Sequence, residues 1–146
     1  MHFNTKGYIF QLKYGKMKKV IKMKVKTGID TVEIERISKS LEISGFADRI
    51  LSDAEYEYYS GKGMKAESIA GAWCAKEAFS KVLGRGFSGF AMDEVQVLHD
   101  DLGKPYYSLL GAAAELAKEQ GITSLDLSIT HDKTRATAVA VALTED

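Results

Sequence analysis

The spacing of hydrophobic and polar positions predicts a strand followed by a helix around Asp30. Residues 24–29 alternate polar and apolar side chains, which is typical of a strand with one buried face, and they lead directly into Asp30. Glu33 follows Asp30 at the spacing of a helix-opening capping box. We therefore expect a helix after this strand, with apolar core positions at Val32, Ile34 and Ile37.

Three more helices are predicted before the first glycine-rich loop. One covers residues 44–50, and the next opens at Ser52, where Glu55 completes a second capping-box spacing. The longest helical pattern runs over residues 66–83, where alanine is frequent and proline is absent. Gly84 stands where a glycine commonly ends a helix.

The second half of the chain combines short strands with one helix. Strands are predicted at residues 94–98 and 106–109, a helix at residues 111–120, and two final strands at residues 124–130 and 135–143. Alanines alternate with larger residues along the last strand, so one of its faces is small and the other is bulky. This order of elements predicts an α+β domain with a mainly antiparallel sheet.

The composition is that of a globular protein. Hydrophobic residues make up 45% of the chain and charged residues 27%, which excludes a disordered, collagen-like or low-complexity protein. A single cysteine excludes an internal disulfide framework and a multi-cysteine metal site, and it favours a reducing compartment. No apolar run approaches the roughly 20 residues of a membrane span. We therefore expect a cytoplasmic protein.

The net charge of zero hides an asymmetry along the chain. Residues 1–26 hold eight lysines and no acidic residue, so the remainder carries a net charge of −8. We expect residues 1–23 to be a lysine-rich leader that is a candidate for disorder, and residues 24–146 to be the folded domain. Lysines interrupt every apolar stretch of the leader, which argues against a signal peptide. A transit peptide, a nucleic-acid-binding arm and a start at Met17 or Met23 are the alternatives.

Two carboxylates in separate elements are the first candidates for a chemical site. Asp30 stands where a predicted strand meets a turn, and Glu77 lies one helical turn before Lys81. Local sequence alone favours simpler roles, which are an N-cap for Asp30 and a surface ion pair between Glu77 and Lys81. Together, the two carboxylates suit a hard cation such as Mg²⁺, which keeps water molecules and substrate phosphate oxygens in its coordination shell.

Other signals of a cofactor are weak. The chain has no cysteine pair and no histidine pair at helical spacing, so a zinc site is not expected. Cys74, inside the long helical pattern, is expected to be a small core residue. His131 ends a predicted strand, where it could donate to a phosphate, although a histidine in a turn is more often simply solvated. The glycine-rich loop at residues 84–89 matches neither standard phosphate-binding motif.

Five segments carry a stronger signal when they are read in order. They are residues 28–37 (GIDTVEIERI), residues 46–51 with Glu55, residues 75–81 (AKEAFSK), residues 103–105 (GKP) and residues 128–131 (SITH). In this order they resemble the holo-[acyl-carrier-protein] synthase family, the short single-domain class of 4′-phosphopantetheinyl transferases. The resemblance covers residues 24–143 and is most specific in the combination of the first and third segments.

The resemblance implies a fold and a reaction. The fold would be that of the 4′-phosphopantetheinyl transferases, with one long central helix. The reaction would transfer the 4′-phosphopantetheine group from coenzyme A to a serine of apo acyl carrier protein and release 3′,5′-ADP. Asp30 and Glu77 would be catalytic and hold Mg²⁺, and Lys81 would lie at the coenzyme A phosphates. The resemblance leaves the identity of the general base open: it is either a carboxylate or a water molecule held by the metal.

The resemblance also implies binding sites and partners. Gly103, Lys104, Pro105 and His131 would contact the nucleotide end of coenzyme A. The expected partner is acyl carrier protein in fatty-acid biosynthesis, and the expected assembly is a homotrimer with shared active sites, without nucleic acid or membrane. Because the carrier is acidic, its docking requires a local basic patch, for which the candidates are Arg36, Lys39 and Arg49.

Two alternatives belong to other functional classes. The family often has an arginine at the position of Ala72 and an aromatic residue at the position of Arg135, so the chain could be a non-catalytic module that binds coenzyme A or the carrier. The lysine-rich leader could instead bind nucleic acid. The net charge of −8 on the rest of the chain argues against that role, because binding to a phosphate backbone needs a clustered basic surface.

Overall fold

The computed structural model describes residues 8–14 and 17–145 and forms an α+β fold. Its elements are β1 (Tyr8–Tyr14), β2 (Met17–Glu33), α1 (Ile34–Leu41), α2 (Phe46–Ile50), α3 (Asp53–Ser60), α4 (Ala66–Leu83), the 3₁₀ helix η1 (Met92–Glu94), β3 (Val95–His99), β4 (Pro105–Leu109), α5 (Gly111–Glu119), β5 (Ile122–His131) and β6 (Arg135–Glu145). The predicted α+β class and the antiparallel sheet are confirmed.

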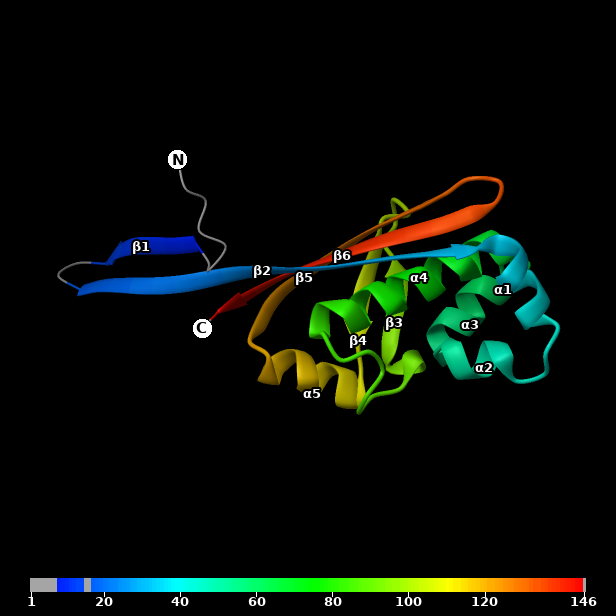
Figure 1. Cartoon of the computed structure of the whole chain (residues 1–146), viewed down its shortest axis with the longest axis horizontal. Helices are drawn as coiled ribbons and strands as arrows, with labels where there is room; N and C mark the ends of the chain where they lie inside the picture. The colour runs from blue at the N-terminus through cyan, green and yellow to red at the C-terminus, as the bar shows by residue number, and fades with distance from the viewer. Residues whose placement is uncertain (1–7, 15–16, 146) are drawn as a thin grey trace.

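The main sheet supports the long helix α4. Its strand order is β1-β2-β6-β5, all antiparallel, and β3 pairs with β4 in a separate hairpin. Figure 1 shows β2 running along most of the molecule, from its hairpin with β1 to the start of α1. α4 lies against β2 and β6, with α1, α2 and α3 gathered near its first half and α5 near its second half.

The predicted boundary after residue 23 falls inside β2. The first part of β2 pairs with β1, from Met17 opposite Tyr14 to Met23 opposite Tyr8. The rest of β2, from Met23 to Glu33, pairs with β6. The strand is therefore continuous across the boundary, and the division of the chain into a leader and a domain stays a prediction.

Small residues allow α4 to lie directly on the sheet. The face of β6 toward the helix carries four alanines that are at most 1% exposed, namely Ala136, Ala138, Ala140 and Ala142. A side-chain carbon at Gly28 would lie 1.9 Å from the carbonyl oxygen of Ala78, closer than two such atoms can approach. Only glycine fits at this crossing of β2 and α4. Because side chains alternate along a strand, Asp30 shares the face of Gly28 that meets α4.

The predicted N-cap role of Asp30 is wrong. β2 continues through Asp30, which pairs with Ala138, and α1 begins only at Ile34. The N-cap of α1 is Glu33, whose side chain makes no capping hydrogen bond. The physical reason is that β6 pairs with β2 from Met23 through to Glu33, so the sheet ladder replaces the local cap.

The predicted capping box of α3 is confirmed, and its glutamate has a second role. The backbone N–H of Glu55 donates to Ser52 Oγ at 3.3 Å, and that of Ser52 donates to Glu55 Oε2 at 2.9 Å. Lys76 Nζ lies 2.8 Å from the same Oε2, and neither side chain is exposed. Lys76 also donates to the carbonyl of Val95, and Glu55 Oε1 accepts from the N–H of Val97. This buried ion pair joins α3, α4 and β3.

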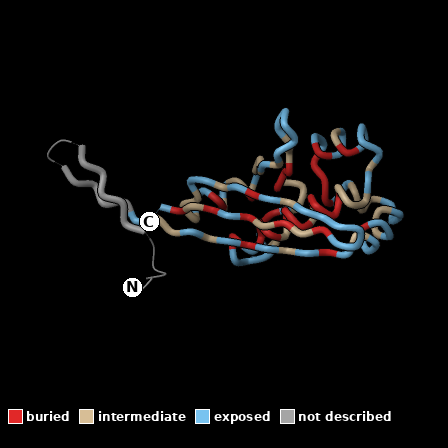
Figure 2. Tube along the Cα trace, turned by 90° about the horizontal axis from the view of Figure 1, so that it is seen from above, coloured by how far each residue is buried: buried red, intermediate tan, exposed pale blue. Residues whose placement is uncertain are grey.

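The hydrophobic core follows α4. Its first half packs with α1, α2 and α3 through residues such as Ile37, Ile50 and Ile69, and its second half packs with β3 and α5 through Phe79 and Val95. In Figure 2, buried positions recur along the central strands of the sheet with exposed or partly exposed ones between them. Among the described residues, no helix has the length and hydropathy that crossing a membrane requires.

Candidate active site

The crossing of β2 and α4 brings Asp30 and Lys81 into an ion pair. Lys81 Nζ lies 2.9 Å from Asp30 Oδ1 and also donates to the carbonyl of Ile29 at 2.6 Å. The Asp30 side chain is 19% exposed and that of Lys81 is 49% exposed. Lys81 thus binds across two elements, and its ion pair is with Asp30 instead of with Glu77 on its own helix. The ion pair lies where the buried contact of β2 with α4 reaches the surface, and its partial exposure leaves it accessible to a ligand.

Glu77 shares the electrostatic environment of this pair. Partial burial raises the pKa of Glu77, and the negative charge of Asp30 raises that pKa further. The positive charges of Lys81 and Arg36 act in the opposite direction. Two carboxylates on different elements therefore repel each other at one place, a repulsion that a bound cation would relieve.

The pair of carboxylates fits a hard cation that shares its ligands with a substrate. Among the described residues, no cluster of three or more histidine, cysteine, aspartate or glutamate side chains could hold a metal by itself. Mg²⁺ is commonly bound through one or two carboxylates, with water molecules and substrate phosphates completing the shell. Asp30 and Glu77 supply that donor set. A closed zinc site, which needs more nitrogen or sulfur ligands, does not fit.

Cys74 lies beside the two carboxylates and belongs to the core. The residue is fully buried, and its Sγ donates to the carbonyl of Ala136 at 3.4 Å. Burial raises the pKa of the thiol to about 12, and the negative charge of Asp30 adds to the effect. The thiol therefore stays protonated at neutral pH and is a poor nucleophile, in agreement with the core role expected from the sequence.

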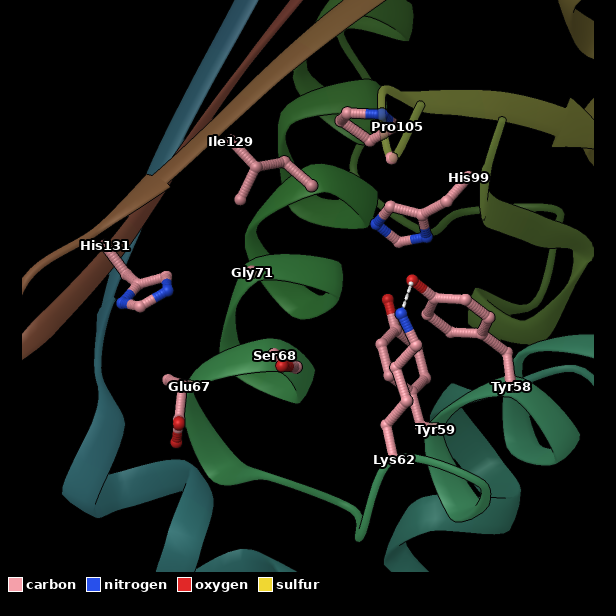
Figure 3. Close-up of a pocket in the computed structure, with 11 residues that line it drawn as sticks. Tyr58, Tyr59, Lys62, Glu67, Ser68, Gly71, His99, Pro105, Ile129 and His131 are labelled. Atoms are coloured by element: carbon pink, nitrogen blue, oxygen red, sulfur yellow. Dashed lines mark hydrogen bonds between the residues drawn. The ribbon is translucent and has the colours of Figure 1, made fainter. Parts of the chain in front are cut away.

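A second group of predicted residues meets in a pocket of about 260 Å³. Gly103 and Pro105 from the turn between β3 and β4 line it, together with His131 at the end of β5. Figure 3 shows these walls around the first turns of α4, where Ser68 and Gly71 lie. Lys104 is held elsewhere, because its Nζ lies 3.1 Å from Asp126 Oδ1 on β5. The structure thus brings three of the four predicted nucleotide contacts together.

The pocket has a wall that sequence reasoning missed. The rings of Tyr58 and His99 stack with centroids 4.7 Å apart and planes 9° apart. Lys62 Nζ donates to the Tyr58 hydroxyl at 2.7 Å, as the dashed line in Figure 3 marks. The aromatic half of this wall has a signal in the sequence, since α3 carries three tyrosines, Tyr56, Tyr58 and Tyr59. His99 had none, because a histidine at the end of a strand is unremarkable until its neighbours are known.

The predicted docking residues are exposed on α1 and α2. Arg36 and Lys39 lie on α1, and Arg49 lies on α2. Lys39 Nζ forms an ion pair of 2.7 Å with Glu35 one turn earlier. Arg36 is close enough to Glu77 to lower the pKa of that carboxyl. Of the three residues, Arg36 is therefore the one whose charge acts on the carboxylate site.

The comparisons with known proteins agree with this geometry. A sequence model of the 4′-phosphopantetheinyl transferase superfamily matches residues 26–141. The holo-[acyl-carrier-protein] synthase of Thermoanaerobacter sp. (strain X514) is 43% identical over 122 residues, which are 83% of this chain and 88% of the relative. The chain belongs to this family of enzymes. The resemblance of its five sequence segments to the holo-[acyl-carrier-protein] synthases is thereby confirmed.

Solved structures of synthases have the same fold. The holo-[acyl-carrier-protein] synthase of Neisseria meningitidis is 32% identical, with a TM-score of 0.75 over 80% of this chain and 96% of that one. The synthase of Helicobacter pylori, solved in complex with coenzyme A, is 33% identical, with a TM-score of 0.69 over 80% of this chain and 98% of that one. The family match begins at residue 26, so β1 and the first part of β2 lie outside it.

The charges around Glu77 predict how its titration responds to substitution. Asp30→Asn removes a neighbouring negative charge and should lower the pKa of Glu77, whereas Lys81→Met removes a positive charge and should raise it. Carbon-13 NMR of the side-chain carboxyl across a pH series measures both shifts. Glu115→Gln, an exposed change on α5, is the control and should leave the Glu77 titration in place. Shifts in the same direction for both variants would contradict the assigned arrangement.

Proposed function

We propose that the chain transfers the 4′-phosphopantetheine group of coenzyme A to a serine hydroxyl of apo acyl carrier protein. The observation that carries the proposal is the meeting of Asp30, Glu77 and Lys81 at the crossing of β2 and α4, in a chain of the synthase family. The coenzyme A complex of the Helicobacter pylori relative supports the identity of the donor. Fatty-acid biosynthesis in the cytoplasm is the setting that we propose for the reaction.

The reaction moves one phosphoryl-linked group between two oxygens. The serine oxygen forms a bond to the phosphorus that carries pantetheine, and the bond from that phosphorus to the bridging pyrophosphate oxygen breaks. The products are the modified carrier and 3′,5′-ADP, and the serine proton passes to a base. Negative charge grows on the bridging oxygen, so positive groups near the pyrophosphate lower the barrier. We propose that Lys81, which lies beside the carboxylate of Asp30, takes that role as a point charge.

We propose that Asp30 and Glu77 hold Mg²⁺. The bound ion would neutralise the repulsion between the two carboxylates and stabilise negative charge on the pyrophosphate. The raised pKa of Glu77 supports this proposal, because partial burial raises it first and the negative charge of Asp30 raises it further, so the two carboxylates lie close enough to interact. Gly103, Lys104, Pro105 and His131 are proposed to bind the nucleotide end, and three of them line the same pocket.

Replacing either carboxylate should abolish turnover without unfolding the chain. Asp30→Asn and Glu77→Gln change charge but hardly change volume, and each should lower kcat by about 10²- to 10³-fold. Mass spectrometry of apo acyl carrier protein incubated with coenzyme A and Mg²⁺ measures the added phosphopantetheine. Chelation of Mg²⁺ should stop the reaction, and added Mg²⁺ should restore it.

The same assay separates the main proposal from a non-catalytic module. Glu115→Gln is the matched control, since it removes one exposed carboxylate from α5, and it should keep the full rate. If the unchanged chain binds coenzyme A but gives no modified carrier, the transferase proposal is overturned. If Asp30→Asn or Glu77→Gln keeps the original rate, the metal assignment is overturned.

We propose that the carrier protein docks on α1 and α2 through Arg36, Lys39 and Arg49. Arg36→Glu should raise the KM for apo carrier by about tenfold and leave the KM for coenzyme A nearly unchanged, with a smaller effect at high salt. Lys118→Glu is the matched control, because it reverses an exposed charge on α5, away from α1 and α2, and it should leave both KM values in place. Initial rates against carrier concentration measure both. Equal effects of the two variants would contradict a specific role for Arg36.

We also propose that the chain associates with copies of itself as a homotrimer. The sheet face opposite α4 carries apolar side chains that are well exposed, with Ile29 at 61%, Val25 at 48% and Val141 at 38%. Light scattering after size exclusion should give three times the chain mass. Ile29→Lys should lower that mass, and Leu102→Lys, at a hairpin tip that is 96% exposed, should not. The mass of a single chain for the unchanged protein would overturn the proposal.

A further inference from the structure

The Tyr58–His99 wall is held together by ring contacts within the protein. His99 comes from the end of β3 and Tyr58 from α3, and their rings stack face to face. Tyr59 meets His99 edge to face, with centroids 6.3 Å apart and planes 88° apart. Two aromatic contacts at right angles hold the imidazole in one orientation at the pocket. The proposed transfer reaction gives this ring no role.

The two nitrogens of His99 have different surroundings. Nδ1 is buried and has no hydrogen-bond partner among the described residues. A neutral imidazole carries one proton, and a buried N–H without an acceptor is both rare and costly. The proton therefore belongs on Nε2. Figure 3 shows the imidazole reaching from β3 toward the middle of the pocket, with His131 on the far side.

The surroundings of His99 favour the neutral form of its imidazole. Burial lowers the pKa of His99, and the positive charge of Lys62 lowers it further, against the opposing effects of Asp100 and Glu55. A second proton would have to sit on Nδ1, where no described group accepts it. His99 is thus an uncharged donor whose single N–H is aimed by its neighbours. Besides His99, the pocket lining holds two basic groups, Lys62 and His131, and one carboxylate, Glu67. The two basic groups suit a ligand rich in acceptor oxygens.

We propose that His99 is a specificity-determining residue, whose Nε2–H donates a hydrogen bond to an acceptor oxygen at the nucleotide end of coenzyme A. This inference rests on the proposed function and extends it to a residue outside the five segments that resemble the family. The geometry supports a role in binding, because the pocket is built by β3, β5 and the start of α4, away from the pair of Asp30 and Lys81. His99 therefore affects the KM for coenzyme A and leaves kcat nearly unchanged.

The test measures binding of 3′,5′-ADP, which carries the nucleotide end alone, by calorimetry. His99→Phe keeps a ring against Tyr58 but removes the donor, and it should raise the Kd by about tenfold, which corresponds to about 1.4 kcal/mol. His99→Gln restores an N–H near the position of Nε2 and should bring the Kd to within about threefold of the original value. In the transfer assay, His99→Phe should raise the KM for coenzyme A and leave the KM for the carrier in place.

Matched controls separate the donor from packing. Glu115→Gln, an exposed change on α5 outside the pocket, should change the Kd by less than about twofold. Circular dichroism checks the fold of each variant, and His99→Ala serves as the second variant if phenylalanine is not accommodated. A Kd for His99→Phe equal to the original would overturn the inference. So would a His99→Gln variant as weak as His99→Phe, because packing alone would then explain the loss.

The experiment also distinguishes this inference from the proposed function. If the unchanged chain binds 3′,5′-ADP and His99→Phe binds it equally well, only the role of His99 is overturned. If the unchanged chain does not bind 3′,5′-ADP at all, the proposed function is overturned and the role of His99 is overturned with it. Weaker binding by His99→Phe with recovery in His99→Gln supports both.

Discussion

The contact of α4 with the sheet at Gly28 is the constraint on which the rest of the structure depends. No side chain fits between the backbone of β2 and the carbonyl of Ala78, so helix and strand meet at the closest approach that two backbones allow. The alanines of β6 continue this contact on the neighbouring strand. The position of α4 therefore follows from a row of small residues, and Asp30 and Lys81 face each other as a consequence.

The rotation of α4 about its own axis is set from its other side. Lys76, the residue before Glu77, is fully buried and binds Glu55 and two backbone carbonyls. Burial lowers the pKa of Lys76, and the carboxylate of Glu55 opposes that shift. Removing one member of such a pair typically costs about 3–5 kcal/mol. A helix anchored through Lys76 on one side presents Glu77 and Lys81 toward β2 on the other.

The two regions of the proposed site depend on different interactions. At Asp30 and Glu77, like charges are held together on rigid elements, and this stored repulsion favours a cation. At the pocket, aromatic stacking aims the neutral donor of His99. We propose the first region for the reacting phosphates and the second for recognition of the remainder of the substrate. Both lie along α4, which is why a single helix can connect binding to chemistry.

The sequence by itself determined the helices, the α+β class and the small face of β6, because the periodicity of side chains depends only on residues close together in the chain. It also determined the family, because the order of the five segments is visible in the sequence. Only the tertiary structure decided the role of Asp30, which local spacing presented as an N-cap until β6 paired with it. Likewise, the sequence predicted Glu55 as part of a capping box, but it did not predict the buried ion pair with Lys76, which lies 21 residues away in the chain. The His99 wall depends on side chains from separate elements, and such contacts exist only after the chain has folded.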